Sequence, residues 1–189
     1  SEPARDVARQ LRELASNLYW TWNHGGDRFW RNLAPEVWDR TRSPWIVLQN
    51  LPSGTLERMA TDPEARQALA EMTGRERSYR DAPAWGADLL GDEDKGGCVA
   101  YFSMEFALGA ALPLYAGGLG ILAGDHLKAA SDLGLPVVGV GLMYQEGYSR
   151  QQIDEDGAQR DLYYYNDSRN LPIQPVEDET QGWLRVAVE

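Results

Sequence analysis

The residues best suited to chemistry are the glycines of the run AGGLGILAGD, residues 116–125. Glycine allows a positive φ and leaves the main chain open to a ligand. The run lies between an apolar segment, residues 98–106, and a helical pattern that ends near Leu133. A helix that begins after such a turn presents unpaired N–H groups and roughly half a positive charge. We therefore predict that these N–H groups bind a phosphate, at Gly117, Gly118, Leu119 and Gly120.

Two common nucleotide-binding motifs do not fit this glycine run. A Walker loop continues with Gly-Lys-Ser/Thr, which does not follow here. A dinucleotide fingerprint requires a glycine where Ala123 stands, and an acidic residue at the end of the next strand, residues 142–144, which reads LMY. Glycine pairs also occur in turns that only bring a helix close to a strand, so this simpler alternative stays open.

Few other side chains could take part in catalysis. Glu105 directly follows the apolar segment, where its carboxylate could position a substrate hydroxyl or a water, or could pair with an arginine; both alternatives stay open. His126 shares an apolar stripe with Leu122 and Ala130, which predicts a packed, neutral histidine. His24 stands in a polar turn, and no nucleophile elbow or metal-ligand spacing occurs. We therefore expect no metal site and only part of an active site.

A βαβ unit is predicted to position these residues. The near-continuous apolar run CVAYFSM, residues 98–104, is typical of a strand buried on both faces of a parallel sheet. Residues 135–143, LPVVGVGLM, predict a second buried strand after the helix. Ligands bind at the carboxyl ends of such strands, where Glu105, the glycine run and residues 144–148 lie. Peripheral sheet segments are expected at residues 163–165, 171–173 and 183–188.

Residues 1–80 are predicted to be helical. Apolar residues recur at helical spacing near the N-terminus, at Val7, Leu11, Leu14, Leu18 and Trp22. Proline at the first helical position marks three further helix starts, after Ala34, Ser43 and Asp62. Residues 81–97 predict a surface linker, in which the acidic cluster 92–94 forms a solvated loop. The expected organisation is thus a helical region, 1–80, a linker, 81–97, and the first part of an α/β domain with peripheral strands, 98–189.

Five of the seven tryptophans lie close together in the helical region, namely Trp20, Trp22, Trp30, Trp38 and Trp45. Aromatic faces stack on pyranose rings, so these side chains could line a sugar site. They also follow helical spacing and lie beside Leu33, Val37 and Leu48. A helical core built from large side chains is therefore the favoured interpretation.

The composition restricts the partners that we expect. The formal net charge of −11 at pH 7 repels nucleic acid and anionic lipid. Cys98 is the one cysteine, which excludes an internal disulfide and is typical of a reducing compartment. The sequence predicts neither a signal peptide nor a membrane span. Because the chain begins at Ser1 without Met and stops at Glu189 within a strand-like run, we expect a fragment.

Several motifs together resemble the α-1,4-glucan phosphorylases, the family of glycogen and maltodextrin phosphorylases. These are AYFSMEF at 100–106, the glycine run, AGDHLK at 123–128, ASDLGLP at 130–136 and VGVGL at 138–142. Residues 11–51, with Leu-x-x-Leu-Ala and Trp-x-Trp-Asn, are similar to the extra N-terminal helical region of the bacterial branch. The resemblance spans nearly the whole chain and implies an N-terminal segment of such an enzyme.

The resemblance implies a two-lobed glycosyltransferase with a Rossmann-like domain in each lobe. The fold class expected here is therefore α/β, with a helical region before the start of a Rossmann-like parallel sheet. The activity implied is phosphorolysis of the non-reducing ends of α-1,4-glucan by inorganic phosphate, which gives glucose 1-phosphate, in the cytoplasm. The implied cofactor is pyridoxal phosphate, whose anchoring lysine lies outside this chain. Whether the enzyme forms a homo-oligomer is an open alternative.

The resemblance also implies roles for particular residues. In the family the glycine loop lends backbone N–H groups to the phosphate region, which maps to Gly117, Gly118, Leu119 and Gly120. The glutamate of Ser-x-Glu-Phe lies at the active site, which maps to Glu105. Two departures leave the substrate subsites open: residues 107–110 read ALGA where near relatives often have GLHE, and Ser149 stands where relatives often have Phe.

Two other functions remain as alternatives. Glycogen or starch synthase also uses Gly-Gly-Leu-Gly, but with a lysine shortly before the glycines, where this chain has residues 114–116, LYA. A non-catalytic glucan-binding module would use the tryptophans as a stacking platform. We expect the isolated chain to be inactive in phosphorolysis and to bind no pyridoxal phosphate covalently.

Overall fold

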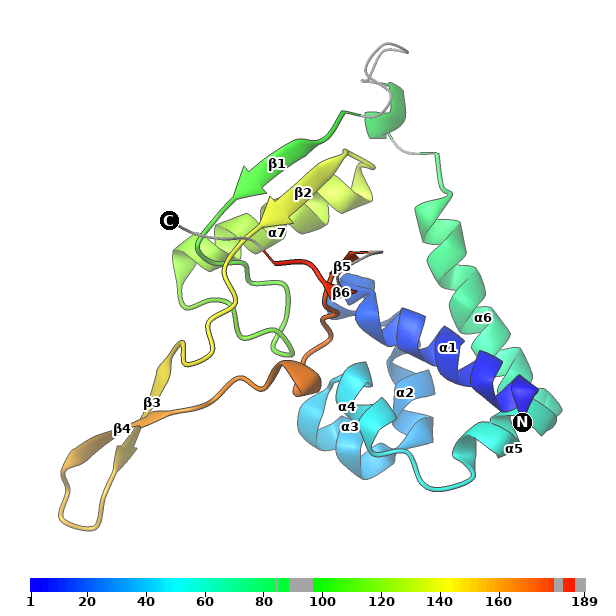
Figure 1. Cartoon of the computed structure of the whole chain (residues 1–189), viewed down its shortest axis with the longest axis horizontal. Helices are drawn as coiled ribbons and strands as arrows, with labels where there is room; N and C mark the ends of the chain where they lie inside the picture. The colour runs from blue at the N-terminus through cyan, green and yellow to red at the C-terminus, as the bar shows by residue number, and fades with distance from the viewer. Residues whose placement is uncertain (84, 89–96, 179–181, 186–189) are drawn as a thin grey trace.

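A helical region and a βαβ unit are the two main parts of the computed structural model, which describes residues 1–83, 85–88, 97–178 and 182–185 (Figure 1). The mixture of helices and small sheets agrees with the expected α/β class. The acidic cluster 92–94 lies outside the described residues. The division of the chain at residues 80 and 97 stays a prediction.

Six α-helices and two 3-10 helices are described in the first 80 residues. They are α1 (Glu2–Ser16), η1 (Leu18–Thr21), η2 (His24–Gly26), α2 (Asp27–Leu33), α3 (Pro35–Thr41), α4 (Pro44–Gln49), α5 (Thr55–Thr61) and α6 (Pro63–Arg80). The predicted proline starts are confirmed at α3, α4 and α6. The Asp62 carboxylate accepts a hydrogen bond from the Glu64 N–H at 3.0 Å, which satisfies one of the N–H groups that α6 leaves free.

The helix predicted from the apolar spacing near the N-terminus is confirmed in its first part only. Three of its residues are buried in α1, namely Val7, Leu11 and Leu14. The helix ends at Ser16 and does not continue to Leu18 and Trp22. The reason is Asn17, whose side chain accepts a hydrogen bond from the Tyr19 N–H at 3.0 Å and starts η1. Such local side-chain bonds compete with the helix.

Large aromatic side chains fill the centre of the helical region. Trp30 and Trp38 are only 1% and 2% exposed. They pack with aliphatic residues from α1 and from α4 to α6, among them Leu11, Val47, Met59 and Leu69. The core interpretation is confirmed for these two tryptophans, whereas the other three of the group are half-buried.

The predicted βαβ unit is confirmed. It consists of β1 (Val99–Phe102), α7 (Gly118–Asp132) and β2 (Val137–Val140). β1 pairs with β2 in parallel, with Val99 opposite Val137 and Phe102 opposite Val140. In Figure 1, α7 lies along one face of the two strands. Gly139 faces this helix, because a Cβ there would lie 2.7 Å from Leu127 Cδ1.

The expectation that both strands are buried on two faces is wrong for this chain. Phe102 is 72% exposed, and Val99, Val138 and Val140 are exposed as well. Helix α7 covers the face that carries Tyr101 and Gly139, and no second layer covers the other face among the residues described. The two strands therefore carry more apolar side chains than the described part of the chain buries.

The peripheral strands differ from the expectation. A hairpin of β3 (Ser149–Ile153) and β4 (Gln159–Tyr163) extends away from the rest of the chain, and all of its strand residues are exposed (Figure 1). Its turn contains Gly157 at φ +79°, a conformation that favours glycine. β4 ends where residues 163–165 were expected to begin a sheet segment.

The other two expected segments are mostly not strands. Residues 171–173 follow η5 (Ser168–Asn170) without forming a strand. Of residues 183–188, only Trp183 belongs to a strand, β6 (Gly182–Trp183), which pairs with β5 (Glu177–Asp178); residues 186–188 lie outside the described part. A further short helix, η3 (Trp85–Asp88), precedes β1.

Hydrogen bonds join the helical region to the rest of the chain. The carboxylate oxygen Oδ1 of Asp132, at the end of α7, accepts bonds from Tyr79 Oη at 2.7 Å and Trp22 Nε1 at 3.2 Å. At a second place, Trp45 Nε1 donates to the Arg169 carbonyl at 3.0 Å. These contacts fix helices α4 and α6 relative to segments that follow more than 50 residues later.

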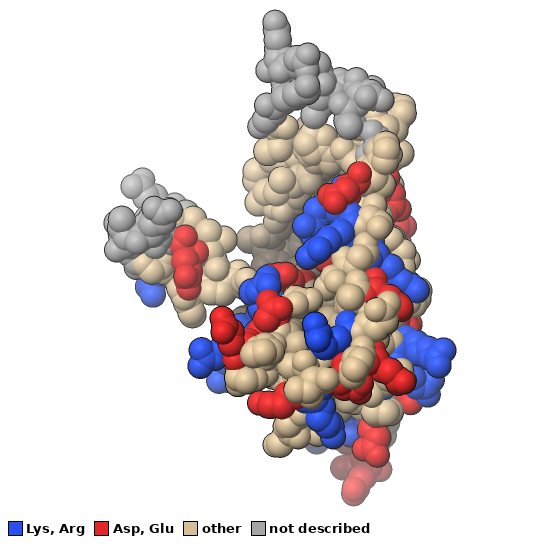
Figure 2. All heavy atoms as spheres, turned by 90° about the vertical axis from the view of Figure 1, so that its right-hand side faces the viewer, with Lys and Arg blue, Asp and Glu red and all other residues tan. Residues whose placement is uncertain are grey.

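The surface of the helical region mixes charges of both signs. Figure 2 shows basic and acidic side chains interspersed over the visible face. On α1, for example, Arg9 Nη1 lies 2.9 Å from Glu13 Oε1. Of the helices that the structure describes, none has the length and apolar character needed to cross a membrane.

Candidate functional site

The glycine run forms the start of α7. Gly117 caps the helix with φ +81°, and α7 begins at Gly118. A Cβ added at Gly117 or Gly118 would meet no atom within 4 Å, so this side of the loop is open. Within the described ranges, the N–H groups of Gly117, Gly118 and Leu119 have no hydrogen-bond acceptor. Three of the four predicted donors are thus free, as is usual in the first turn of a helix.

The carboxylate of Glu105 occupies one side of this loop. Its Oε1 accepts a hydrogen bond from Tyr148 Oη at 2.6 Å, and its Oε2 accepts one from the Ala116 N–H at 3.2 Å. The N–H of Gly120, the fourth predicted donor, is also directed to this carboxylate. A Cβ at Gly120 would lie 3.0 Å from Oε2, so glycine is what allows the close approach.

These hydrogen bonds set the protonation states of both side chains. The pKa of Glu105 lies below its ordinary value of 4.5, first because of the Tyr148 bond and then because of the N–H groups of Ala116 and Gly120. The bond to Glu105 also raises the pKa of Tyr148 to about 12, since the carboxylate charge opposes the phenolate. Near neutral pH, a charged carboxylate therefore faces a protonated hydroxyl.

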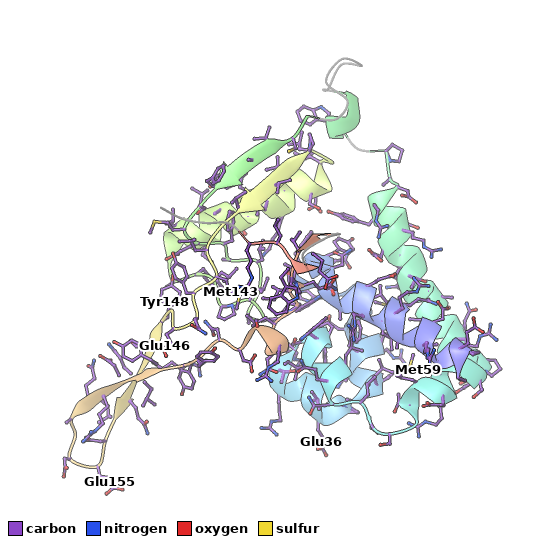
Figure 3. All side chains as sticks on the ribbon, in the orientation of Figure 1. Glu36, Met59, Met143, Glu146, Tyr148 and Glu155 are labelled. Carbon is purple, nitrogen blue, oxygen red and sulfur yellow. The ribbon has the colours of Figure 1, made fainter. Side chains whose placement is uncertain are left out.

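Tyr148 lies in the segment between β2 and β3, beside Glu146 and Met143 (Figure 3). The start of this segment is anchored by Tyr144, whose hydroxyl donates to the Met104 carbonyl at 3.1 Å. The sequence placed residues 144–148 at the end of the second strand, but it did not identify Tyr148 as the partner of Glu105. A pairing across 43 residues has no spacing signal, so only the strand-end rule could have suggested it.

Close packing of α7 holds the loop in place. The Ala107 N–H donates to the Gly120 carbonyl at 2.8 Å. One turn later, a Cβ at Gly124 would overlap the backbone of Ala107. The helix thus contacts the segment after Glu105 through glycines, which fixes the carboxylate against the start of α7.

The prediction of a packed His126 is wrong. The side chain is exposed, and its ring contacts Tyr101 edge-on at a centroid distance of 5.1 Å. The residues that α7 buries are small ones, namely Gly120, Ala123, Gly124 and Ala130. Because short side chains allow the helix to approach the neighbouring backbone, the larger Leu119 and Leu122 remain on the exposed side.

In the part of the chain that the structure describes, no group of three or more His, Cys, Asp or Glu side chains could hold a metal ion. The expectation that the protein has no metal site stays a prediction. The chemistry of the site rests on backbone N–H groups, one carboxylate and one phenol.

Residues 6–112 match the family described as "Protein of unknown function (DUF3417)". The chain belongs to the DUF3417 family. The DUF3417 match covers more than half of the chain and ends just before the glycine run. It therefore includes the helical region from residue 6 on, together with β1 and Glu105.

Relatives of this DUF3417 chain include named phosphorylases. Maltodextrin phosphorylase of Thermococcus litoralis is 34% identical over 94% of the chain and 21% of its own length. Glycogen phosphorylase of Mycobacterium tuberculosis is 37% identical over 89% of the chain and 20% of its length. Glycogen phosphorylase of Aquifex aeolicus is 35% identical over 96% of the chain and 25% of its length. The resemblance to glucan phosphorylases is thus confirmed.

The chain spans about a fifth to a quarter of the length of these relatives. No solved structure matches the chain. What the relatives act on therefore applies to this DUF3417 chain only as a proposal.

Proposed function

We propose that this chain is the N-terminal segment of an α-1,4-glucan phosphorylase. The enzyme would cleave glucose from non-reducing ends with inorganic phosphate and release glucose 1-phosphate. The names of the relatives support this class and give no support to the synthase alternative. The observation that carries the proposal is the open start of α7, where the N–H groups of Gly117, Gly118 and Leu119 are free among the described residues.

The loop fits a phosphate group in chemistry and in access. N–H groups at a helix start bind oxyanions, and no side chain obstructs Gly117 or Gly118. The same donors would suit the phosphate region of pyridoxal phosphate, a cofactor whose phosphate supplies proton transfer to the substrate phosphate when bound. The lysine that anchors this cofactor would come from the remaining part of the enzyme.

Glu105 would position a substrate hydroxyl or a water beside the loop. Its negative charge repels a phosphate at short range, and the chain as a whole carries a net charge of −11. Phosphate binding would therefore need basic groups from the remaining part of the enzyme. The loop supplies directed donors, and the other lobe would supply the positive charge.

The same proposal covers the architecture and the setting. The βαβ unit would be the start of a Rossmann-like domain in a two-lobed enzyme, and further segments would cover its exposed face. The protein would act in the cytoplasm on glucan, phosphate and glucose 1-phosphate, without nucleic acid or membrane as a partner. The chain by itself would be inactive.

Replacing Gly118 with valine tests the phosphate loop. In this chain an added Cβ at Gly118 meets no atom within 4 Å, so Gly118→Val should fold normally while blocking the approach of a phosphate. In the whole enzyme we expect phosphorolysis to fall by roughly a hundredfold, comparable to the loss of one oxyanion donor. Gly74→Val on α6, also in open space, is the matched control. A normal rate in Gly118→Val would contradict the loop assignment.

The isolated chain gives a second test. We expect no release of glucose 1-phosphate from maltodextrin and phosphate by the 189-residue chain, measured by a coupled assay. Turnover by the pure chain would show that the segment holds a whole active site, contrary to the proposal.

A further inference from the structure

Asn166 joins the two segments that flank the hairpin of β3 and β4. Its backbone N–H donates to the Gln145 carbonyl at 2.7 Å, and its side-chain Nδ2 donates to the Tyr144 carbonyl at 2.8 Å. One residue after β4 thus binds two adjacent carbonyls of the segment that follows β2. We propose that Asn166 is a positioning residue, which holds Tyr148 against Glu105 from outside the site.

The bound carbonyls belong to a tight turn that ends just before Tyr148. A Cβ added at Gly147 would lie 3.2 Å from the Tyr144 Cβ, so the chain folds back on itself here. The Tyr144 hydroxyl donates to the carbonyl of Met104 at 3.1 Å, directly before Glu105 in the chain. The turn is therefore fixed at its start beside the same residue that Tyr148 reaches from its end.

The hairpin alone cannot fix the position of Tyr148. Tyr148 directly precedes β3, and all residues of β3 and β4 are exposed. An isolated two-stranded hairpin is only marginally stable in water. The geometry at its base therefore depends on contacts outside the hairpin, and Asn166 supplies two hydrogen bonds at this place.

The segment that follows Asn166 is anchored to the helical region. Trp45 Nε1 donates to the Arg169 carbonyl at 3.0 Å, and the side-chain amide of Gln49 donates to the same oxygen. Leu171, two residues later, is buried. Helix α4 thus holds η5, which lies beside it in Figure 1 and begins two residues after Asn166.

The orientation of Glu105 depends on supports from two sides. The start of α7 supplies the Ala116 N–H, and the segment after β2 supplies the Tyr148 hydroxyl. A misplacement of about 1 Å at a reacting centre can lower a rate by roughly a hundredfold. A use of Glu105 in phosphorolysis rests on the proposed function, whereas the positioning by Asn166 does not.

Amide exchange of the whole enzyme, resolved by mass spectrometry, tests this positioning far from the replaced residue. The Ala116 N–H reports on the carboxylate, because it donates to Glu105 Oε2 at 3.2 Å. Asn166→Ala removes the side-chain bond to Tyr144 and should speed exchange at Ala116 by roughly two- to tenfold, the scale of one hydrogen bond. Tyr148→Phe should have an effect of the same size.

Two further variants separate the hydrogen bond from the shape of the side chain. Asn166→Asp keeps the size of the side chain but has no N–H donor, so it should behave as Asn166→Ala does. Asn170→Ala is the matched control, because the Asn170 side chain is exposed and takes part in no hydrogen bond among the described residues. Its exchange at Ala116 should equal that of the wild type.

The link to the helical region is tested by the same measurement. Trp45→Phe combined with Gln49→Ala removes both donors to the Arg169 carbonyl and should also speed exchange at Ala116. Trp20→Phe is the control for the loss of an indole, because Trp20 Nε1 donates to a carbonyl within the helical region. Equal effects of Trp20→Phe and the double variant would contradict a specific link through η5.

The kinetics of phosphorolysis show whether Asn166 acts through Tyr148. We expect Asn166→Ala and Tyr148→Phe each to lower kcat by roughly tenfold. The two together should lower it no further, because both remove the same support of Glu105. Effects that multiply to about a hundredfold would mean independent roles and would contradict the inference.

The outcomes distinguish this inference from the proposed function. Unchanged exchange at Ala116 in both Asn166 variants would overturn the inference, whatever reaction the enzyme catalyses. Faster exchange in Asn170→Ala as well would overturn it too, since any change near η5 would then have the same effect. Exchange as expected in an enzyme without phosphorolysis would support the positioning and contradict the proposed function alone.

Discussion

The hydroxyl of Tyr148 donates a hydrogen bond of 2.6 Å to Oε1 of Glu105, and the other carboxylate oxygen accepts the Ala116 N–H. The start of α7 is therefore joined through one carboxylate to the segment that follows β2. Three stretches of chain meet at this point, which makes the carboxylate the geometric centre of the proposed site.

Tyr148→Phe removes the largest cause of the lowered Glu105 pKa. We expect the pKa of Glu105 to rise toward 4.5 in the variant, while the N–H groups of Ala116 and Gly120 keep part of the shift. Carboxyl ¹³C NMR across an acid titration measures this value. Tyr144→Phe is the matched control, because the Tyr144 hydroxyl donates to the Met104 carbonyl and not to Glu105. An unchanged pKa in Tyr148→Phe would contradict the observed contact.

The same pair predicts a pH window for stability. The lowered pKa of Glu105 makes its contribution present above the unfolded value, near 4.5, and lost as pH falls through the lower folded value. The pKa of Tyr148 is raised to about 12, so its contribution is present below 10.0 and lost as pH rises through about 12. The stability difference between wild type and Tyr148→Phe should thus form a plateau between these limits. Urea unfolding at a series of pH values tests this, and a difference that is the same at acid pH would refute it.

Substitutions of a closely packed glycine and of an exposed glycine should change the free energy of unfolding in opposite directions. Gly124→Ala places a Cβ into the backbone of Ala107 and should cost about 1–3 kcal/mol of unfolding free energy. Gly74→Ala lies in α6 with no atom within 4 Å and should instead stabilise the helix by about 0.5–1 kcal/mol. Urea unfolding of both variants gives the two signs. Equal effects would mean that α7 does not pack on Ala107 as described.

An alkaline titration tests the hydrogen bond between Tyr79 of α6 and Asp132 of α7. The pKa of Tyr79 is raised to about 12, first by burial, while the Asp132 carboxylate raises it further and the bond with Ser131 lowers it. Asp132→Asn should lower this pKa and leave it above 10.0, because burial remains. Phenolate absorbance, taken as the difference from Tyr79→Phe in each background, isolates this residue. If Asp132→Asn left the pKa of Tyr79 unchanged, the hydrogen bond between Tyr79 and Asp132 would not persist in solution.

The sequence predicted those parts of the fold that local chemistry determines. The starts of α3, α4 and α6 follow from proline and its capping residue, and the βαβ unit follows from two apolar runs around a glycine turn. The end of α1 was missed, because Asn17 ends the helix by a side-chain bond within an otherwise helical pattern. The hairpin of β3 and β4 was missed because its strands are polar and exposed, so no apolar alternation marks them.

The candidate site was predictable in its backbone but not in its side-chain partners. The glycine pattern located the open start of α7 correctly, since glycine there serves the main chain. The prediction that His126 is packed was wrong because the helical spacing of large apolar residues was taken to mark the buried face. Helix α7 instead buries its small residues. The Tyr148 partner of Glu105 depends on how the segment after β2 turns back, which is a tertiary property without a local signature.

The strands of the βαβ unit carry Phe102, Val138 and Val140 on a face that meets solvent. An uncovered apolar strand pair exposes an aggregation-prone apolar surface. Its edge strands also present unpaired backbone N–H and C=O groups that can pair with another strand. Produced alone, such a polypeptide should bind chaperones and precipitate early in sulfate salts, which strengthen apolar contacts. Its handling in the laboratory would then improve with polar replacements such as Phe102→Lys, without any change at the glycine loop.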